Sequence, residues 1–250
     1  MSAILRLEGL SKRFGALAVS QDICLELAPG RLHALIGPNG AGKTSLINQI
    51  SGALAPDAGR IFFEDEDVTR LGLAQRARRG LVRSFQVASL FDGFSALDNV
   101  ALAAQARAGS SFRFFARAGK AADLNAKARV ALDRVGLGER VGRRAGELSH
   151  GERRLLEIAV ALACQPRLLL LDEPFAGLGV EESAEALALL QTLKTEVTML
   201  LVEHDMEAVF ALADDVSVLV GGRLIASGAP EAIRQSPAVR EAYLGEGEAA

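Results

Sequence analysis

A glycine-rich segment near the start of the chain most strongly limits its fold. It follows an apolar run at 32–36 and consists of Gly37, Pro38, Asn39, Gly40, Ala41, Gly42, Lys43, Thr44 and Ser45. It contains the Gly-x-x-x-x-Gly-Lys-Thr phosphate loop, in which glycines let several N–H groups point at one place before a helix N-terminus. The segment predicts a nucleoside triphosphate site, where Lys43 neutralises phosphate oxygens and Thr44 places a hydroxyl on Mg²⁺. A glycine-rich turn that binds nothing is the alternative.

Composition narrows the class of protein. With 250 residues, 50% of them hydrophobic, the chain can form one domain carrying an inserted lobe. Its longest unbroken apolar run, 158–164, is too short to cross a bilayer, and the N-terminus lacks a signal sequence, so we expect a cytoplasmic protein. Cys24 and Cys164 lie in apolar contexts that predict buried free thiols. The net charge of -3 argues against a polyanion partner such as nucleic acid.

The N-terminal part alternates as half-buried strands do. Residues 4–10 and 23–27 predict strands, and residues 11–15 between them predict a turn. Phe14 in that turn has two possible roles. It is either a minor core residue or an aromatic ring on which a purine base stacks.

From Gln86 to about Gly146 the chain differs in character, because alanine-rich helical periodicity replaces the strands. This change predicts an inserted helical lobe. Basic residues outnumber acidic ones between Arg107 and Arg144. A solvated helix face explains that excess better than nucleic-acid binding, because no aromatic and basic binding module repeats here.

A helix is expected to begin after Ser149. Ser149 can cap it, and Glu152 three residues later completes a capping box. An ordinary capped helix is the simplest interpretation. The same helix N-terminus could also bind an anion.

Two apolar runs at 168–171 and 197–202 predict strands that are buried on both faces. The first ends in Asp172 and Glu173, and the second is followed by His204. Ligands of open α/β sheets lie beyond the carboxyl ends of the strands, so these side chains should face the phosphate loop. Asp172 can hold Mg²⁺ through its water shell, Glu173 can deprotonate the attacking water, and His204 can contact the γ-phosphate.

Taken together, these motifs resemble the ATP-binding cassette (ABC) family over essentially the whole chain. The matching elements are residues 37–44, Gln86, 148–152, 168–173 and His204. The resemblance implies an α/β P-loop NTPase fold, with a RecA-like core of mostly parallel sheet, an antiparallel β-subdomain and an inserted helical subdomain. We therefore expect a single ABC ATPase domain, with the core and β-subdomain at 1–86 and 159–235, the helical subdomain at 87–158 and a tail at 236–250.

The resemblance also implies how the site works, with ATP and Mg²⁺ bound between two head-to-tail chains. Ser149, Gly151 and Glu152 of one chain then act on the nucleotide held by the other chain's phosphate loop, while His204 senses the γ-phosphate. Gln86 contributes to the catalytic and Mg²⁺ sites and links them to a membrane subunit.

A finer resemblance points to the ATPase subunits of branched-chain (hydrophobic) amino acid importers, and among them to the longer of two ATPases. The resemblance to these importers rests on residues 172–178, 202–206 and 242–246, and the choice of the longer ATPase rests on the insertion around 110–122 and on the tail. The implied partners are integral membrane permeases, a second ATPase subunit in a homo- or heterodimer and, indirectly, a substrate-binding protein. This places the chain on the inner face of the cell membrane. The same subfamily also serves urea, amides and carboxylates.

Three positions depart from the family pattern. His150 replaces a glycine, Glu152 a glutamine, and Gly179 an aspartate or asparagine.

Other nucleotide-binding classes fit less well. The chain has no Asn-Lys-x-Asp element of a GTPase, and a small-molecule kinase would not need the segment at 148–152. Cassette proteins that act on DNA or ribosomes commonly hold two cassettes or long coiled-coil arms, for which this chain has no room.

Overall fold

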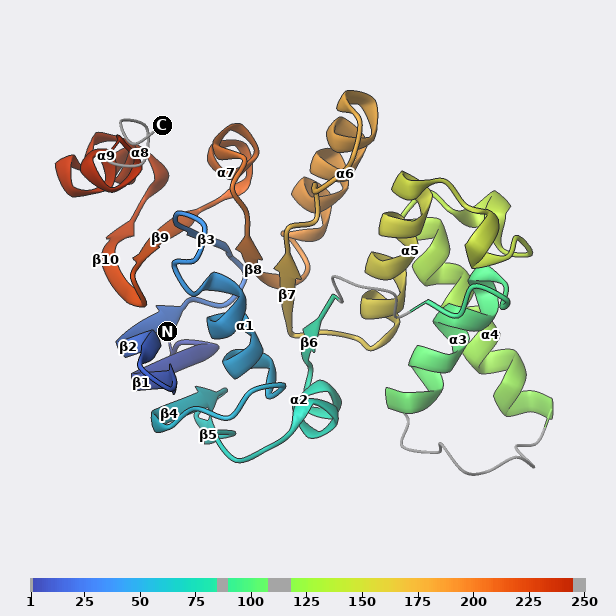
Figure 1. Cartoon of the computed structure of the whole chain (residues 1–250). Coiled ribbons are helices and arrows are strands. Elements are labelled where there is room, and N and C mark those ends of the chain that lie inside the picture. The colour runs from blue at the N-terminus through green and yellow to red at the C-terminus, as the bar shows by residue number, and fades with distance from the viewer. Residues whose placement is uncertain (1, 85–89, 108–117, 245–250) are drawn as a thin grey trace.

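The computed structural model describes residues 2–84, 90–107 and 118–244, except the side chains of 118–121 and 242–244. Two sheets lie side by side at one end of the molecule, and a group of helices lies at the other (Figure 1). The antiparallel sheet, in the order β2-β1-β4-β5, consists of β1 (Leu5–Phe14), β2 (Leu17–Leu27), β4 (Ala58–Phe63) and β5 (Glu66–Asp67). The second sheet, in the order β10-β9-β3-β8-β7-β6, consists of β3 (Leu32–Ile36), β6 (Leu81–Arg83), β7 (Leu168–Asp172), β8 (Thr198–Val202), β9 (Asp215–Val220) and β10 (Arg223–Gly228).

In the second sheet, every pairing from β9 to β6 is parallel, and only β10 pairs antiparallel, with β9. The predicted α/β class, with a mostly parallel core sheet and a separate antiparallel sheet, is confirmed. The α-helices are α1 (Lys43–Ser51), α2 (Leu73–Arg79), α3 (Ala96–Arg107), α4 (Ala118–Arg134), α5 (His150–Ala163), α6 (Val180–Leu193), α7 (Met206–Leu212), α8 (Pro230–Gln235) and α9 (Pro237–Leu244). No helix in the described ranges is long and apolar enough to cross a membrane.

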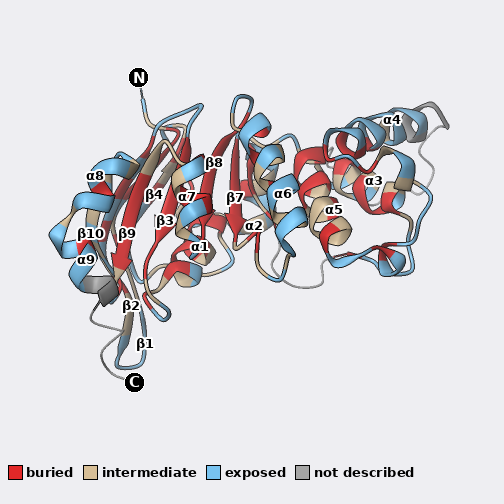
Figure 2. Ribbon diagram, turned by 90° about the horizontal axis from the view of Figure 1, so that it is seen from above, coloured by how far each residue is buried: buried red, intermediate tan, exposed pale blue. Residues whose placement is uncertain are grey.

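Strand β7 is buried on both faces, as its unbroken leucine run predicts (Figure 2). Leu168 and Leu170 join the cluster that contains the inner faces of α1 and the antiparallel sheet. Leu169 and Leu171 join a second cluster, formed with α5 and α6. Because side chains alternate along a strand, Asp172 at the end of β7 lies on the same face as Leu170, which is the α1 face.

Helices α3, α4 and α5 pack on one another beyond β6 and β7, on the side away from the antiparallel sheet (Figure 1). They lie in the part of the chain expected to be helical. The expected boundary between 158 and 159 falls inside α5, because this one helix carries both the capping box and residues that pack beneath the sheet. The division into subdomains stays a prediction.

Two local expectations are wrong. Residues 11–14 are not a turn, because β1 continues to Phe14 and pairs there with the start of β2, with irregularities in register along the way. Cys24 is exposed, because it alternates on β2 with the buried residues Ile23 and Leu25.

Arg76 on α2 is only 1% exposed and anchors the far end of α1. Its guanidinium donates to four backbone carbonyls, those of Leu71, Gln49, Ile50 and Thr69, at 2.7 to 2.9 Å. Gln49 and Ile50 lie in the last turn of α1, where carbonyls lack helical partners and a positive charge is favourable. Burial lowers the pKa of Arg76 to about 10, so it is still charged at neutral pH.

Replacing Arg76 should therefore destabilise the fold. Arg76→Met keeps much of the volume but removes a donor from each of these carbonyls, of which that of Gln49 keeps the Gly52 N–H, and should lower the free energy of unfolding by about 3 to 5 kcal/mol. Arg76→Lys should give an intermediate loss, measured by urea unfolding. The exposed Arg78 on the same helix supplies the control, since Arg78→Met should change stability by less than about 0.5 kcal/mol. Equal effects at the two positions would contradict the prediction.

His33 on β3 is also buried, and its Nε2 shares a hydrogen bond of 2.8 Å with Oγ of Ser217 on β9. Burial lowers its pKa from 6.5 to about 4, and Asp215 offsets part of that shift. The folded protein therefore holds a neutral imidazole at a pH where the unfolded chain already binds a proton.

The sign of the pH effect follows from this difference. As the pH falls from 7 toward 5, protonation of His33 favours the unfolded state and should remove about 2 kcal/mol of stability. Urea unfolding at both pH values measures the loss, with His33→Gln as the comparison because it cannot titrate. The loss of unfolding free energy between pH 7 and pH 5 should be smaller in His33→Gln by about 2 kcal/mol. An equal loss in both proteins would contradict this role of His33.

Candidate functional site

The phosphate loop joins β3 to α1, as predicted, and it is tightly enclosed. At Gly37, with φ 155°, an added Cβ would lie 2.0 Å from the carbonyl oxygen of Leu219. At Gly42, with φ 105°, an added Cβ would lie 2.2 Å from the carbonyl oxygen of Val19. Only glycine fits these two positions, because any side chain would clash with the backbone of β9 or β2.

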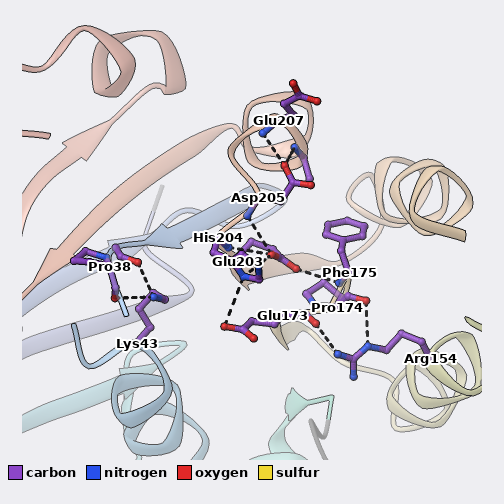
Figure 3. A network of polar contacts seen from close by, with 12 residues as sticks. Pro38, Lys43, Arg154, Glu173, Pro174, Phe175, Glu203, His204, Asp205 and Glu207 are labelled. Carbon is purple, nitrogen blue, oxygen red and sulfur yellow. Dashed lines mark hydrogen bonds and ion pairs between the residues drawn. The ribbon is translucent and has the colours of Figure 1, made fainter. Parts of the chain in front are cut away.

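Lys43 is the first residue of α1 and is 7% exposed. Its Nζ donates to the carbonyl oxygens of Gly37 at 2.6 Å and Pro38 at 3.0 Å (Figure 3). The ammonium group therefore lies against the loop. Thr44, the next residue, is exposed at the same helix N-terminus. Both lie where the motif predicts.

The parallel sheet brings the predicted acids and His204 together. Strands β7 and β8 are neighbours with Asp172 paired to Val202, so both end at the same edge. His204 Nδ1 lies 3.8 Å from Glu173 Oε1, and 3.6 Å from Oε2 of Glu203 (Figure 3). Since β3 pairs with β8 in parallel, the phosphate loop also starts from this edge.

Glu173 has an unusual backbone conformation, with φ 48°. Left-handed angles are costly for a residue with a side chain and persist where neighbours hold them. Here the N–H of Glu173 donates to the Val202 carbonyl at 2.8 Å, and its own carbonyl accepts from Arg154 Nη2 at 2.5 Å. Arg154 lies on α5 and also donates to the Pro174 carbonyl (Figure 3). Helix α5 thus helps to orient Glu173.

Asp172 is 1% exposed, and burial raises its pKa while nearby Arg83 opposes that shift. Nη2 of Arg83, at the end of β6, lies 2.8 Å from Asp172 Oδ2. The other oxygen, Oδ1, is buried and has no hydrogen-bond partner in the described part of the chain. A carboxylate with one such oxygen fits a hydrated Mg²⁺, which is held by oxygen ligands and retains several waters.

Sequence reasoning missed Glu203, which organises the same edge. Its side chain is 1% exposed and accepts from the backbone N–H groups of Phe175, His204 and Asp205 at 3.0 to 3.5 Å. These bonds join the segments that follow β7 and β8. Glu203 directly follows a strand that is buried along its whole length, and this position was the sequence signal that could have indicated its role. Arg83 was missed as well, although it is the only charged residue in the strand 81–83.

The predicted capping box is present at the start of α5. The Glu152 N–H donates to Ser149 Oγ at 3.1 Å, and the Ser149 N–H donates to Glu152 Oε2 at 2.9 Å. Arg140 Nε lies 2.7 Å from Glu152 Oε1, and this bond, followed by that from Ser149, lowers the pKa of Glu152. A pocket beside Ser149 and Gly151 extends to Glu182 on α6.

The structure does not bring every predicted residue to one place. Both views put α5 with α3 and α4, across β7 from α1, so Ser149, Gly151 and Glu152 lie apart from the phosphate loop (Figures 1 and 2). Phe14, at the end of β1, is 52% exposed, which excludes the core role, and Lys12 Nζ lies 5.7 Å from the centre of its ring. Gln86 lies outside the described residues.

Comparisons with known proteins agree with these motifs. The ABC transporter family model matches residues 20–176, and a model described as branched-chain amino acid ATP-binding cassette transporter matches 223–249. The high-affinity branched-chain amino acid transport ATP-binding protein BraF of Pseudomonas aeruginosa is 38% identical, over 97% of this chain and 98% of its own. LivG of Escherichia coli K12, named with the same function, is 40% identical over the same shares. The lipopolysaccharide export system ATP-binding protein LptB of Acidithiobacillus ferridurans is 33% identical, over 98% of each chain.

Solved structures match as well. The ADP conformation of MJ1267, an ATP-binding cassette of an ABC transporter, has a TM-score of 0.86 and 30% identity, covering 98% of this chain and 100% of that one. A nucleotide-free ATP-binding cassette from an ABC transporter has a TM-score of 0.85 and 29% identity, covering 96% and 98%. With motifs, fold and relatives in agreement along nearly its whole length, the chain belongs to the ABC transporter family of ATP-binding proteins.

Proposed function

We propose that this chain is the ATP-hydrolysing subunit of an importer for branched-chain or other hydrophobic amino acids. The observation that carries this proposal is the near-complete alignment with BraF and LivG, at 38% and 40% identity. The match of residues 223–249 to the branched-chain amino acid transporter model supports it independently of the nucleotide site. The proposed partners are integral membrane permeases, a second ABC ATPase subunit and, indirectly, a substrate-binding protein, with the chain on the inner face of the cell membrane.

The chain's own groups suit a bound ATP and Mg²⁺. Backbone N–H groups of residues 39–45 would wrap the phosphates, and Lys43 would exchange its loop carbonyls for phosphate oxygens. Thr44 and Asp172 would hold Mg²⁺, with Gln86 as a further ligand. The metal ion supplies positive charge that neutralises the phosphates. Phe14 offers an exposed ring for stacking of the base.

Glu173 is the proposed general base. Its carboxylate reaches out from the strand edge and is partly exposed, which would allow it to orient a water molecule and accept its proton. His204 lies next to it and is the proposed contact of the γ-phosphate. The backbone bonds from Val202 and Arg154 would keep Glu173 in place during this step.

A second subunit would complete the site. Because α5 lies across β7 from α1, the helix that follows the phosphate loop, we propose that Ser149, Gly151 and Glu152 act on the nucleotide of a head-to-tail partner. The N–H groups at the start of α5 suit an anion, and Arg140 offsets the negative charge of Glu152 there.

Glu173→Gln tests the chemistry. The amide keeps the size of the side chain but cannot accept a proton, so steady-state ATP hydrolysis should fall by about 10² to 10⁴. ATP binding should survive, and paired chains should accumulate because the lost charge lies beside the γ-phosphate. Size-exclusion chromatography with ATP and Mg²⁺, and with the second ATPase subunit if one is required, measures the pairing.

Glu231→Gln, on α8, is the matched control, since that carboxylate is exposed and bonds to Gln235 within its own helix. It should retain most of the hydrolysis. If the Glu173→Gln protein hydrolyses ATP at the normal rate, another residue is the general base. One that is inactive but never pairs would contradict the head-to-tail arrangement.

Purification tests the transport role. A tagged chain taken from detergent-solubilised membranes should carry integral permease subunits. When these are reconstituted with their binding protein, leucine or isoleucine should raise ATP hydrolysis. If only urea, amides or carboxylates stimulate ATP hydrolysis, the imported substrate belongs to one of those classes and is not a hydrophobic amino acid. Copurification with ribosomes, DNA or a lipopolysaccharide export complex would contradict the importer proposal.

A further inference from the structure

The two carboxylate oxygens of Asp172 have different surroundings. Oδ2 accepts from Nη2 of Arg83 at 2.8 Å, and the side chains of Arg83 and Asp172 are 11% and 0% exposed. Oδ1 is equally buried but has no hydrogen-bond partner among the described residues. Buried polar atoms are almost always bonded to protein, water or an ion, so Oδ1 marks the side from which a ligand would approach.

Arg83 also contacts α1, the helix that follows the phosphate loop. Its Nη1 donates to Oδ1 of Asn48, which lies one helical turn after Thr44. The guanidinium is planar and carries its donors in a rigid fork, so two anchored nitrogens restrict its orientation strongly. Arg83 therefore connects the helix that carries Thr44 to the strand that carries Asp172.

We propose that Arg83 is a positioning residue for the metal site. It holds Asp172 so that Oδ1 alone faces Mg²⁺, and it keeps this oxygen in register with the Thr44 hydroxyl. The inference rests on the proposed function, because it assumes that Thr44 and Asp172 hold Mg²⁺ beside ATP.

Charge and positioning predict different results for Arg83→Lys. If only the charge of Arg83 mattered, a lysine in its place would bind Mn²⁺ as the original chain does. If the planar guanidinium positions Asp172, lysine should recover only part of the binding that Arg83→Gln loses, because an ammonium group cannot reproduce the rigid fork. The comparison of the two variants is therefore informative.

The measurement is Mn²⁺ binding to the full chain in the presence of ATP, followed by electron paramagnetic resonance. Arg83→Gln should weaken Mn²⁺ binding by about tenfold or more, and Arg83→Lys should recover part of it. ATP affinity in EDTA should stay within about twofold of that of the original chain. Arg79→Gln is the control, since Arg79 carries the same charge on nearby α2 but pairs with the exposed Glu66.

Unchanged or tighter Mn²⁺ binding in Arg83→Gln would overturn the inference. So would an equal loss of ATP affinity in EDTA, which would indicate a general role in the fold. If Arg83→Gln does not fold, Asn48→Ala removes one anchor of Arg83 and leaves the buried ion pair; a threefold weakening supports the inference and a smaller one overturns it. A wild-type chain that binds no ATP would instead contradict the proposed function.

Discussion

The burial of β7 and β8 on both faces is the constraint on which the rest of the structure depends. Apolar side chains that alternate between two hydrophobic clusters exclude a one-residue slip of these strands, because that slip would exchange their two faces. Their parallel pairing with β3 brings Asp172, Glu173 and His204 to the edge where the phosphate loop begins. The position of the polar site is thus a consequence of apolar packing.

The helix after the phosphate loop is held by two arginines from the segment that leads into the core sheet. Arg76 donates to carbonyls in its last turn, and Arg83 bonds to Asn48 midway along it. Both guanidinium groups lose most of their contact with water; four carbonyl oxygens replace it at Arg76, and the oxygens of Asn48 and Asp172 replace part of it at Arg83. A loop that wraps phosphates needs such a fixed support, since small displacements weaken several N–H contacts at once.

Glu173 shows how the helical part of the molecule reaches the catalytic edge. Its left-handed backbone is held from β8 and, through Arg154, from the helix that begins at Ser149. The proposed contact with a partner's nucleotide and the proposed base are therefore joined by a single side chain. A movement of α5 would shift Arg154 and so disturb its hydrogen bond to the Glu173 carbonyl.

The sequence alone determined the phosphate loop, the apolar strand runs at 32–36 and 168–171, the start of α1, and the capping box at Ser149. Each of these depends on residues close together along the chain, where glycine angles, alternation and capping act locally. Tertiary structure alone decided that Phe14 is exposed, that Arg83 contacts Asp172 and that Glu203 joins two loops. Those contacts join segments tens of residues apart, and no local pattern specifies which polar groups a fold will bury against each other.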